Sequence, residues 1–494
     1  MNMPIGPPFL SALKPGLEIF LVFFVSSAAH GSDVAPPSPE KSWSPPGLDK
    51  YEEQLTNKVL YAKQDAMSVA IDPEKNYDLP ELIDIAERSN PETRIAWEQA
   101  RQAAKAVGLS QSAYYPYLAA SAAAGYQQEL AVLTSVFPSH VGAESATLDM
   151  KWLLFDFGGR KAATTSAREQ LMLANVSFNA THQKIVFNVI QHFYDFITAR
   201  QQVGVAESSL RAAQTVEQAA QSRFDNGLGK KPDLLQAQQQ TAQADYDLES
   251  ARGNLSDAQV ALVESLGIVP STKLQVADAA EKPFVENSDS LDELIDRALS
   301  QRPDLVAGLA EVRARQAGVQ KARAANYPKI SLDAGVGWEA LQVNAYNDHY
   351  FGNSKPDYGI GLSISWPIFD GFIRANKLRI AQSELRSAES ELANSRNAVV
   401  REVWKAYTNL KTALRKQESA AKLLVAAENA FDASLEAYRN GLGTYVDVAN
   451  ARRNVTSARS VVIDTRSAIY TSAAALALSV GDLAKPSPSP QSNH

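Results

Sequence analysis

The chain contains two copies of one unit, and this internal repeat limits its possible folds more than any other feature. Three pairs of segments carry the match: 90–118 with 302–330, 152–160 with 366–374, and 224–238 with 438–452. The first pair is offset by 212 residues and the other two by 214. Because the offset is nearly constant, and too long for a solenoid repeat, the sequence predicts a tandem duplication. We assign repeat 1 to 79–280 and repeat 2 to 281–482.

The two ends of the chain differ in composition from the repeats. Lys14 precedes the apolar run LEIFLVFFV, and small residues follow it, so 1–31 is predicted to be a signal peptide. A short membrane anchor is the alternative, but the run is about half of the roughly 20 residues that a spanning helix needs. A Pro-rich segment follows over 32–78, and 483–494 is predicted to be a disordered tail.

Each repeat contains one segment in which apolar residues alternate with small or polar ones. From Ile330 to Trp338 every second residue is apolar, and the same holds from Tyr358 to Trp366. This period of two predicts β-hairpins at 117–156 and 330–370, with strands of about ten residues. Ten residues is the length of a tilted transmembrane strand. We expect polar loops at about 131–145 and 342–357.

The context of these strands favours a membrane over a soluble sheet. Four strands in two distant hairpins cannot close a barrel within one chain. Trp152, Trp338 and Trp366 fall near predicted strand ends, as in an interfacial aromatic girdle, although such residues also occur in ordinary cores. A small structural sheet in a soluble protein remains the alternative.

Long helices account for most of the remaining sequence. The segment 160–225 has no proline and one glycine, so it can form a helix about 100 Å long at 1.5 Å per residue. An NGLG turn separates it from a second helix at 232–266, and repeat 2 has the same order at 374–439 and 446–480. Apolar residues spaced by three and four predict coiled-coil packing between these helices.

The composition offers little for catalysis or for nucleic-acid binding. The chain has no cysteine, six histidines without an HExxH pattern, and a net charge of −7. We therefore expect no active site, metal or cofactor. Nucleic acid is not an expected partner, because a mildly acidic chain lacks a basic footprint.

With these motifs in view, the sequence resembles the TolC-like outer-membrane efflux proteins. The resemblance rests on the paired NP/RP starts, the YP before a strand, the W-x-(L/I)-F-D at a strand end and the N-G-L-G turn, each present twice. It implies a mostly helical fold with a small transmembrane β part. In that fold four strands per subunit form a twelve-stranded barrel in a homotrimer, which a helical coiled-coil barrel extends into the periplasm.

The resemblance also implies a function and partners. The expected function is a passive exit duct in the outer membrane of a Gram-negative bacterium, serving a tripartite efflux or type I secretion system. The partners would be outer-membrane lipid, a periplasmic adaptor protein and an inner-membrane pump of the RND, ABC or MFS type. A soluble periplasmic coiled-coil scaffold is the alternative function.

The resemblance further suggests two sites near the NGLG turns. The adaptor would dock at the turns, which contain Gly227, Leu228, Gly229, Gly441, Leu442 and Gly443. A pore gate would be formed by carboxylates that three-fold symmetry arranges in rings, from Asp233 and Asp447. Relatives have a second Asp three residues later, whereas this chain has Gln236 and Asn450 there, which predicts a less acidic gate. The alternative is that both Asp residues stabilise the start of a helix.

Overall fold

The computed structural model describes residues 71–132, 136–269, 272–277, 289–345 and 349–483, together with Leu48, Tyr51 and Glu53. The chain divides into two units, Met1–Met67 and Ser68–His494. The elements described below all belong to the second unit. The predicted signal peptide at 1–31, most of the Pro-rich segment and nearly all of the predicted tail lie outside the described residues.

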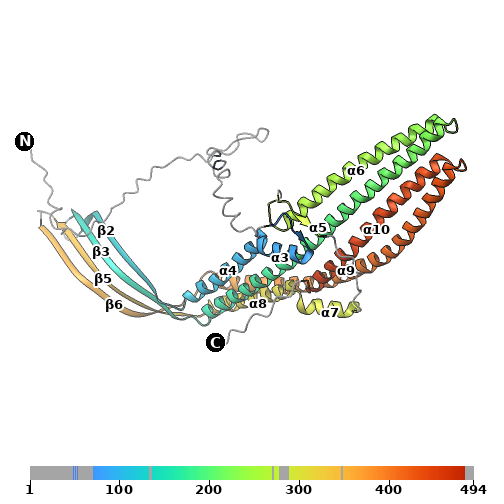
Figure 1. Ribbon diagram of the computed structural model, residues 1–494. Coiled ribbons are helices and arrows are strands. Elements are labelled where there is room, and N and C mark those ends of the chain that lie inside the picture. Colours follow the sequence, from blue (N-terminus) through green and yellow to red (C-terminus); the bar gives the residue numbers. More distant parts are fainter. Residues whose placement is uncertain are drawn as a thin grey trace, which may run out of the picture. The chain divides into compact units, whose positions relative to one another are not determined.

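The two repeats contain the same elements in the same order (Figure 1). The short strand β1 (Asn76–Tyr77) comes just before repeat 1, which contains α3 (Leu79–Ser89), α4 (Pro91–Ser112), β2 (Tyr117–Val132), β3 (Val136–Phe155), α5 (Gly159–Asp225) and α6 (Lys231–Ser265). The short strand β4 (Gln275–Val276) likewise comes just before repeat 2, which contains α7 (Leu291–Gln301), α8 (Pro303–Ala324), β5 (Lys329–Ala345), β6 (His349–Ser365), α9 (Ile373–Arg439) and α10 (Tyr445–Val480). The long helices α5 and α9 begin and end within a residue of the bounds expected from the sequence.

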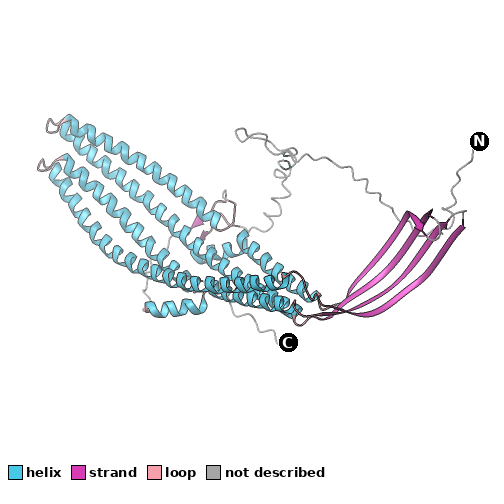
Figure 2. Cartoon of the chain, turned by 180° about the vertical axis from the view of Figure 1, so that it is seen from behind, coloured by secondary structure: helices cyan, strands magenta, loops and turns pink. Residues whose placement is uncertain are grey.

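The four long strands form one antiparallel sheet in the order β2-β3-β5-β6 (Figure 2). Each repeat supplies one hairpin, and β3 pairs with β5 to join them, from His140↔Asn344 to Phe155↔Ile330. The outer strands β2 and β6 each have one edge without a partner strand within the described chain. A sheet with two open edges exposes backbone donors and acceptors that another chain can pair with.

The two faces of this sheet differ in chemistry. One face carries the apolar residues of the alternating pattern, including Tyr358, Ile360, Leu362 and Ile364, all of which are exposed. The opposite face is polar: Ser363 donates to Asp333 at 2.6 Å, and Ser121 and Thr147 share a hydrogen bond of 2.7 Å. An exposed, contiguous apolar surface is typical of contact with a membrane or another protein.

The strands are longer than predicted from the sequence. They contain 16, 20, 17 and 17 residues, not about ten. The polar segments expected to be loops at 131–145 and 342–357 are mostly strand, and those predictions were wrong. The physical reason is that the pairing of β2 with β3 continues from Tyr117↔Lys151 to Val132↔Val136, so the backbone groups of the polar segment are satisfied within the sheet.

A capped corner connects each hairpin to its long helix. Asp156 follows β3 and accepts from the backbone N–H of Arg160 at 2.6 Å, and Asp370 accepts from that of Arg374 at 3.1 Å. Between Asp156 and α5, Phe157 and Gly158 have φ of 52° and 90°. The FD pair noted in the sequence therefore serves to end the strand and cap the helix.

The helices form two antiparallel hairpins, α5–α6 and α9–α10, and α10 packs against α5 to join them. In Figure 1 the four helices lie in the order α6, α5, α10, α9, so α6 and α9 are at the two edges of this helical layer. The largest apolar cluster belongs to repeat 1, where α3, α5, α6 and the two short strands enclose Leu82, Ile185, Val189 and Leu262.

One described helix, α10, is long and apolar enough to cross a membrane by length and composition. In the structure α10 packs against α9 through Ile469 and Val455 and against α5 through Val448. Only 11% of its most apolar 18-residue window is buried inside the chain, so these contacts cover a small part of that apolar surface.

Candidate functional site

The turn between α5 and α6 is built on two glycines. The N–H of Leu228 donates to the carbonyl of Arg223 and that of Gly227 to Phe224, at 2.8 and 3.0 Å, the pattern of a Schellman C-cap. Gly227 has φ of 73°, which favours glycine. At Gly229 an added Cβ would lie 2.9 Å from the backbone nitrogen of Phe224.

The turn between α9 and α10 repeats this geometry. Leu442 donates to the carbonyl of Ala437 at 2.8 Å and Gly441 to Tyr438 at 3.1 Å, with φ of 78° at Gly441. A Cβ on Gly443 would lie 3.2 Å from the Cβ of Ala437, a looser contact than at Gly229. The NGLG motif therefore encodes a tight helical hairpin in both repeats.

Each turn presents one leucine to solvent. Leu228 is 71% exposed and Leu442 is 86% exposed. They occupy corresponding positions in the two repeats, and the hydrogen bonds of each turn fix their backbone. An exposed leucine on a rigid turn is a suitable anchor for a partner protein.

Arg223 joins the two turns to one another. Its guanidinium donates to the carbonyl of Tyr438 at 3.0 Å and to that of Leu228 at 3.2 Å. It also lies over the ring of Tyr438, 5.2 Å from the centroid. Beneath it, Tyr438, Tyr445 and Val448 pack against Val216 and Ala220 of α5. The ends of the two hairpins are thus connected within one chain.

The acidic residues of the predicted gate lie at the starts of α6 and α10. Asp447 forms a capping box with Thr444, whose hydroxyl donates to its carboxylate at 2.6 Å. The hydrogen bonds from Thr444 lower the pKa of Asp447. Asp233 is in the first turn of α6. Burial and then the Asp233 charge raise the pKa of Tyr438, so Asp233 lies close enough to interact with that ring.

These contacts give the two carboxylates different local roles. For Asp447 the structure supplies the helix-start explanation directly, because one carboxylate oxygen accepts both the hydroxyl and the backbone N–H of Thr444. The side chain of Asn450 accepts from Arg453. Whether the carboxylates also form rings depends on other copies of the chain, so the gate stays a proposal.

A second arginine, Arg452, lies further along α10 and is buried. It donates to the hydroxyl of Ser209 on α5 at 2.9 Å and to the side-chain carbonyl of Gln240 on α6 at 3.0 Å. Burial lowers the pKa of its guanidinium. Arg452 therefore ties α10 to both helices of the other hairpin by hydrogen bonds to two neutral side chains.

Four residues that organise these turns were not predicted from the sequence: Arg223, Tyr438, Tyr445 and Arg452. A signal was available in the alignment of the two repeats. Their counterparts are Ala437, Phe224, Lys231 and Gln238, so all four positions differ between copies. Positions at which two copies of one unit diverge are candidates for contacts that only one copy makes.

Of the three tryptophans predicted to form a girdle, two lie at strand ends and one lies inside a strand. Trp152 donates from its indole to the carbonyl of Tyr114, and Trp366 donates to that of Asn326, at 2.9 and 3.1 Å. These equivalent bonds fix a strand end to the preceding helix in both repeats. Trp338 was expected near a strand end but lies well inside β5, because that strand continues to Ala345.

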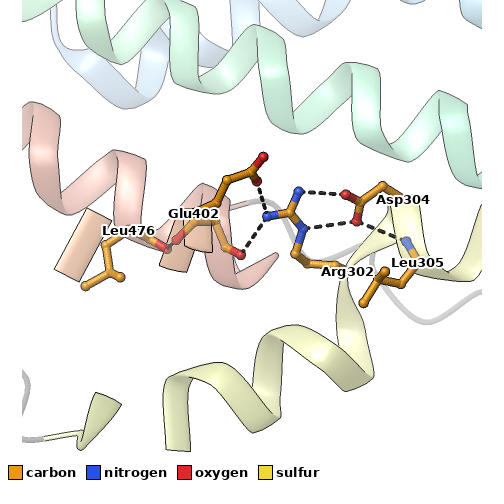
Figure 3. Close-up of polar contacts among 6 residues, drawn as sticks. Arg302, Asp304, Leu305, Glu402 and Leu476 are labelled. Carbon is orange, nitrogen blue, oxygen red and sulfur yellow. Dashed lines mark hydrogen bonds and ion pairs between the residues drawn. The ribbon is translucent and has the colours of Figure 1, made fainter. Parts of the chain in front are cut away.

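A third polar cluster lies where α10 ends and α8 begins (Figure 3). Arg302 donates to Glu402 at 2.6 Å and to Asp304 at 2.7 Å, and also to the backbone carbonyl of Ser479. A pocket of about 440 Å³ lies beside it. In repeat 1 the corresponding Asn90 donates to the carbonyl of Ser265 at 3.1 Å, so both clusters join the end of one helix to the start of another.

The described residues contain no group of three or more His, Asp or Glu side chains that could hold a metal ion. Within each polar cluster, at the turns and at the start of α8, the side chains are hydrogen-bonded to their neighbours. These clusters hold together two long helical hairpins, which continue from an amphipathic sheet.

The repeated architecture agrees with a known family. The family model described as Outer membrane efflux protein matches the chain twice, over residues 82–268 and 294–482. The chain belongs to this family. Each match falls within one of the two repeats, so the family model agrees with the division of this chain into two units.

Several relatives align over most of their length. Protein CyaE of Bordetella pertussis is 28% identical, over 76% of this chain and 77% of the relative. Outer membrane protein TolC of Vibrio cholerae is 22% identical, over 76% and 84%. Cation efflux system protein CusC of Escherichia coli is 24% identical, over 75% and 79%.

Solved structures of outer-membrane channels share the fold. VceC of Vibrio cholerae has a TM-score of 0.69 and 20% identity, covering 82% of this chain and 96% of that one. CmeC of Campylobacter jejuni has a TM-score of 0.71 and 18% identity, covering 82% and 85%.

The family assigns a location and a general role to the features described above. The chain is an efflux channel protein of the Gram-negative outer membrane that extends into the periplasm. The predicted family, fold class and location are confirmed. The soluble scaffold is not supported, since the uncovered apolar face of the sheet suits a membrane-embedded protein.

Proposed function

We propose that three copies of this chain form one continuous exit duct. Their twelve strands would close a β-barrel in the outer membrane, and their helices would extend it as a hollow barrel into the periplasm. The observation that carries the proposal is the amphipathic four-stranded sheet with two open edges. Such a sheet satisfies its edge hydrogen bonds and covers its apolar face only by closing with other copies inside a bilayer.

The mass of the detergent-solubilised protein tests this assembly. We expect a particle of three chains that migrates as an oligomer in mild detergent. After boiling it should migrate as a monomer. A monomeric or dimeric particle with intact secondary structure would contradict the proposal.

The partners of the duct would dock at the two turns. The exposed Leu228 and Leu442, held by Gly227 and Gly441, would contact the helical hairpin of a periplasmic adaptor, which links the duct to an inner-membrane pump of the RND, ABC or MFS type. Supporting this role, each turn presents an apolar side chain on a rigid backbone about 100 Å of helix away from the sheet.

Replacing each exposed leucine by serine separates docking from folding. Leu228→Ser together with Leu442→Ser leaves the glycines and all turn hydrogen bonds in place. We expect normal trimer in the outer membrane but loss of export and of adaptor binding. Val425→Ser, at another exposed apolar residue on α9, is a control for general loss of surface apolarity. Normal export by the double variant would reject docking at the turns.

The gate would lie just beyond the turns, where Asp447, Asp233 and Asn450 of three copies approach one another. Carboxylates brought close together attract cations, so the duct would be cation-selective at its narrowest point. Relatives have a second Asp three residues after the first, where this chain has Gln236 and Asn450. We therefore expect no second ring of carboxylates and a less acidic gate. Cargo would then be set by the pump and by the size of this opening, and would include small molecules or a polypeptide.

Two substitutions at Asp447 distinguish the ring from the helix cap. Asp447→Asn removes the charge but retains an oxygen that can accept from Thr444, whereas Asp447→Ala removes both. If the ring operates, both variants should show weaker block by multivalent cations in planar bilayers. If only Asp447→Ala changes the channel, the residue serves as a cap and the ring is rejected.

A further inference from the structure

A hollow of about 440 Å³ lies where α10 ends and α8 begins, between the long helices α5 and α9. The export, docking and gating roles proposed above make no use of it. Much of its lining is small or apolar: Ala180, Pro303, Ala406, Ala475 and Leu478. A mostly apolar lining with a few polar groups is the usual form of a small-molecule site.

The helix junction beside this hollow is more open than its counterpart in repeat 1. At the end of α6, a Cβ on Gly267 would lie 2.5 Å from the Cα of Asn90, so the two helix ends are in close contact. At the end of α10, a Cβ on Gly481 would lie 3.5 Å from the Cα of Arg302. The long side chain of Arg302 spans this wider junction and donates to the carbonyl of Ser479 at 3.3 Å.

The polar lining of the hollow includes a group with a net negative charge. Arg302 donates to the carboxylates of Asp304 and Glu402, at 2.7 and 2.6 Å, and lies between them (Figure 3). Since two carboxylates share one guanidinium, one negative charge is left over. All three residues line the hollow, and their mutual hydrogen bonds hold the two carboxylates in place there.

A positive charge lines the same hollow. Lys405 follows Glu402 by three residues on α9, so the two side chains lie one helical turn apart, with roughly 5–6 Å between their Cβ atoms. Among the described residues, Asp304 and Glu402 pair with Arg302 and neither pairs with Lys405. The amide of Asn409, one turn further along, offers both a donor and an acceptor.

We infer that this hollow binds a small zwitterion with an apolar body, of the class of apolar amino acids. The ammonium of the ligand would lie near the carboxylates of Asp304 and Glu402, and its carboxylate near Lys405. The apolar body would cover the alanines of α9 and α10. The inference goes beyond the proposed duct: the site is complete within one chain and needs neither the gate nor the tip.

Three probes of similar size separate the two charges of the ligand. Phenylalanine carries both charges, phenylpropionate lacks the ammonium, and phenylethylamine lacks the carboxylate. In equilibrium dialysis of the detergent-solubilised full chain, we expect saturable binding of one phenylalanine per chain. Each analogue should bind at least about tenfold more weakly, which is the loss expected when one hydrogen bond between charged groups is removed.

Two variants place the binding in this hollow. Lys405→Gln should weaken phenylalanine binding by about tenfold and leave phenylethylamine binding unchanged, because only the carboxylate loses its partner. Ala475→Leu places a larger side chain in the hollow and should abolish binding of all three probes. Lys416→Gln, at an exposed lysine on the same helix, is the matched control and should bind all three probes like the parent.

Three results would overturn the inference: no saturable binding of phenylalanine, phenylpropionate binding as tight as phenylalanine binding, or phenylalanine binding that Lys405→Gln leaves unchanged. Uptake that is equal in all variants and does not saturate is partition into detergent and counts as no binding. The proposed duct is judged separately by mass and conductance. An oligomer of three chains that conducts but binds no phenylalanine would refute this site and leave the duct intact.

Discussion

Two arginines, Arg223 and Arg452, connect the two helical hairpins at and near their turns. Arg223 is hydrogen-bonded to two backbone carbonyls and covers an aromatic ring, whereas Arg452 is buried and binds two neutral side chains. Hydrogen bonds from a charged donor are stronger than neutral ones, and a carbonyl that loses its donor inside a contact is costly to leave unsatisfied. The relative position of the two hairpins thus depends on a few side chains.

Arg223→Ala should loosen the turns. We expect faster amide hydrogen exchange in the residues around Tyr438 and Leu228, corresponding to a local loss of roughly 2 kcal/mol from charged hydrogen bonds. Arg211→Ala, a surface arginine on the same helix whose nearest carboxylate is 4.0 Å away, is the matched control. Equal exchange in the two variants would show that Arg223 does not hold the turns together.

The cap at Asp447 should make the start of α10 sensitive to acid. Hydrogen bonds from Thr444 lower the pKa of this carboxyl in the folded chain. A group with a depressed pKa contributes stability above its unfolded pKa of about 3.9, and that contribution is lost as the pH falls through the folded value. Amide protection in the first turn of α10, that is, exchange relative to the intrinsic rate at each pH, should therefore fall on acidification below about pH 4. In Asp447→Asn this acid-dependent loss of protection should be absent, and the same loss in that variant would contradict the assignment.

Most individual site residues were identifiable from the sequence only as members of a repeated motif. The glycines and leucines of the turns were found because they occur twice at one offset. Arg223 and Tyr438 were not predicted, because their roles depend on the contact between the α5–α6 hairpin and the α9–α10 hairpin. Asp447 was recognised as acidic at a helix start, but only the coordinates show that its carboxylate is bonded to Thr444.

At the level of elements, the two turns should differ in their tolerance of a side chain. Gly229→Ala places a Cβ 2.9 Å from a backbone nitrogen, whereas Gly443→Ala places one no closer than 3.2 Å to any neighbour, the Cβ of Ala437. We expect Gly229→Ala to lower the thermal midpoint of the turn region more than Gly443→Ala does. As a control, Gly253→Ala in the interior of α6 meets nothing within 4 Å and should stabilise that helix by about 0.5–1 kcal/mol. Equal losses at Gly229 and Gly443 would contradict the steric argument.

The strand-to-helix corners should also differ between repeats. The Asp156–Arg160 pair is more buried than Asp370–Arg374, with side chains 11–12% exposed against 16–21%. Removing one partner of a buried pair leaves an uncompensated charge and costs about 3–5 kcal/mol. Asp156→Ala should therefore reduce the amount of assembled protein more than Asp370→Ala, as judged by heat-modifiable oligomer on gels. A larger loss of oligomer from Asp370→Ala than from Asp156→Ala would contradict this prediction.

The elements themselves were largely readable from the sequence because their signals are local. A long segment without proline predicted α5 and α9, and alternation predicted the strands. The extent of the strands was not readable, because residues such as Glu144 and Ser139 are polar and their pairing with neighbouring strands keeps them in the sheet. Periodicity reports which face a residue occupies, but not how far a ladder continues beyond the apolar region.

For the whole molecule, the internal repeat has the greatest explanatory value. It places two hairpins in one sheet, two helical hairpins in one layer, and leaves matching edges on both. We expect these edges to be covered by other copies of the chain. The oligomer is an expectation from the family resemblance, and the open edges of the sheet support it.

The most direct measurement of the central claim is the conductance of the purified oligomer in a planar lipid bilayer. If the sheet forms a membrane-spanning barrel that opens into the helical duct, insertion should give discrete, long-lived conductance steps. Arg223→Ala, which loosens the turns at the far end, should give larger steps than the parent. Absence of conductance from both proteins, despite insertion of folded oligomer into the bilayer, would contradict the account.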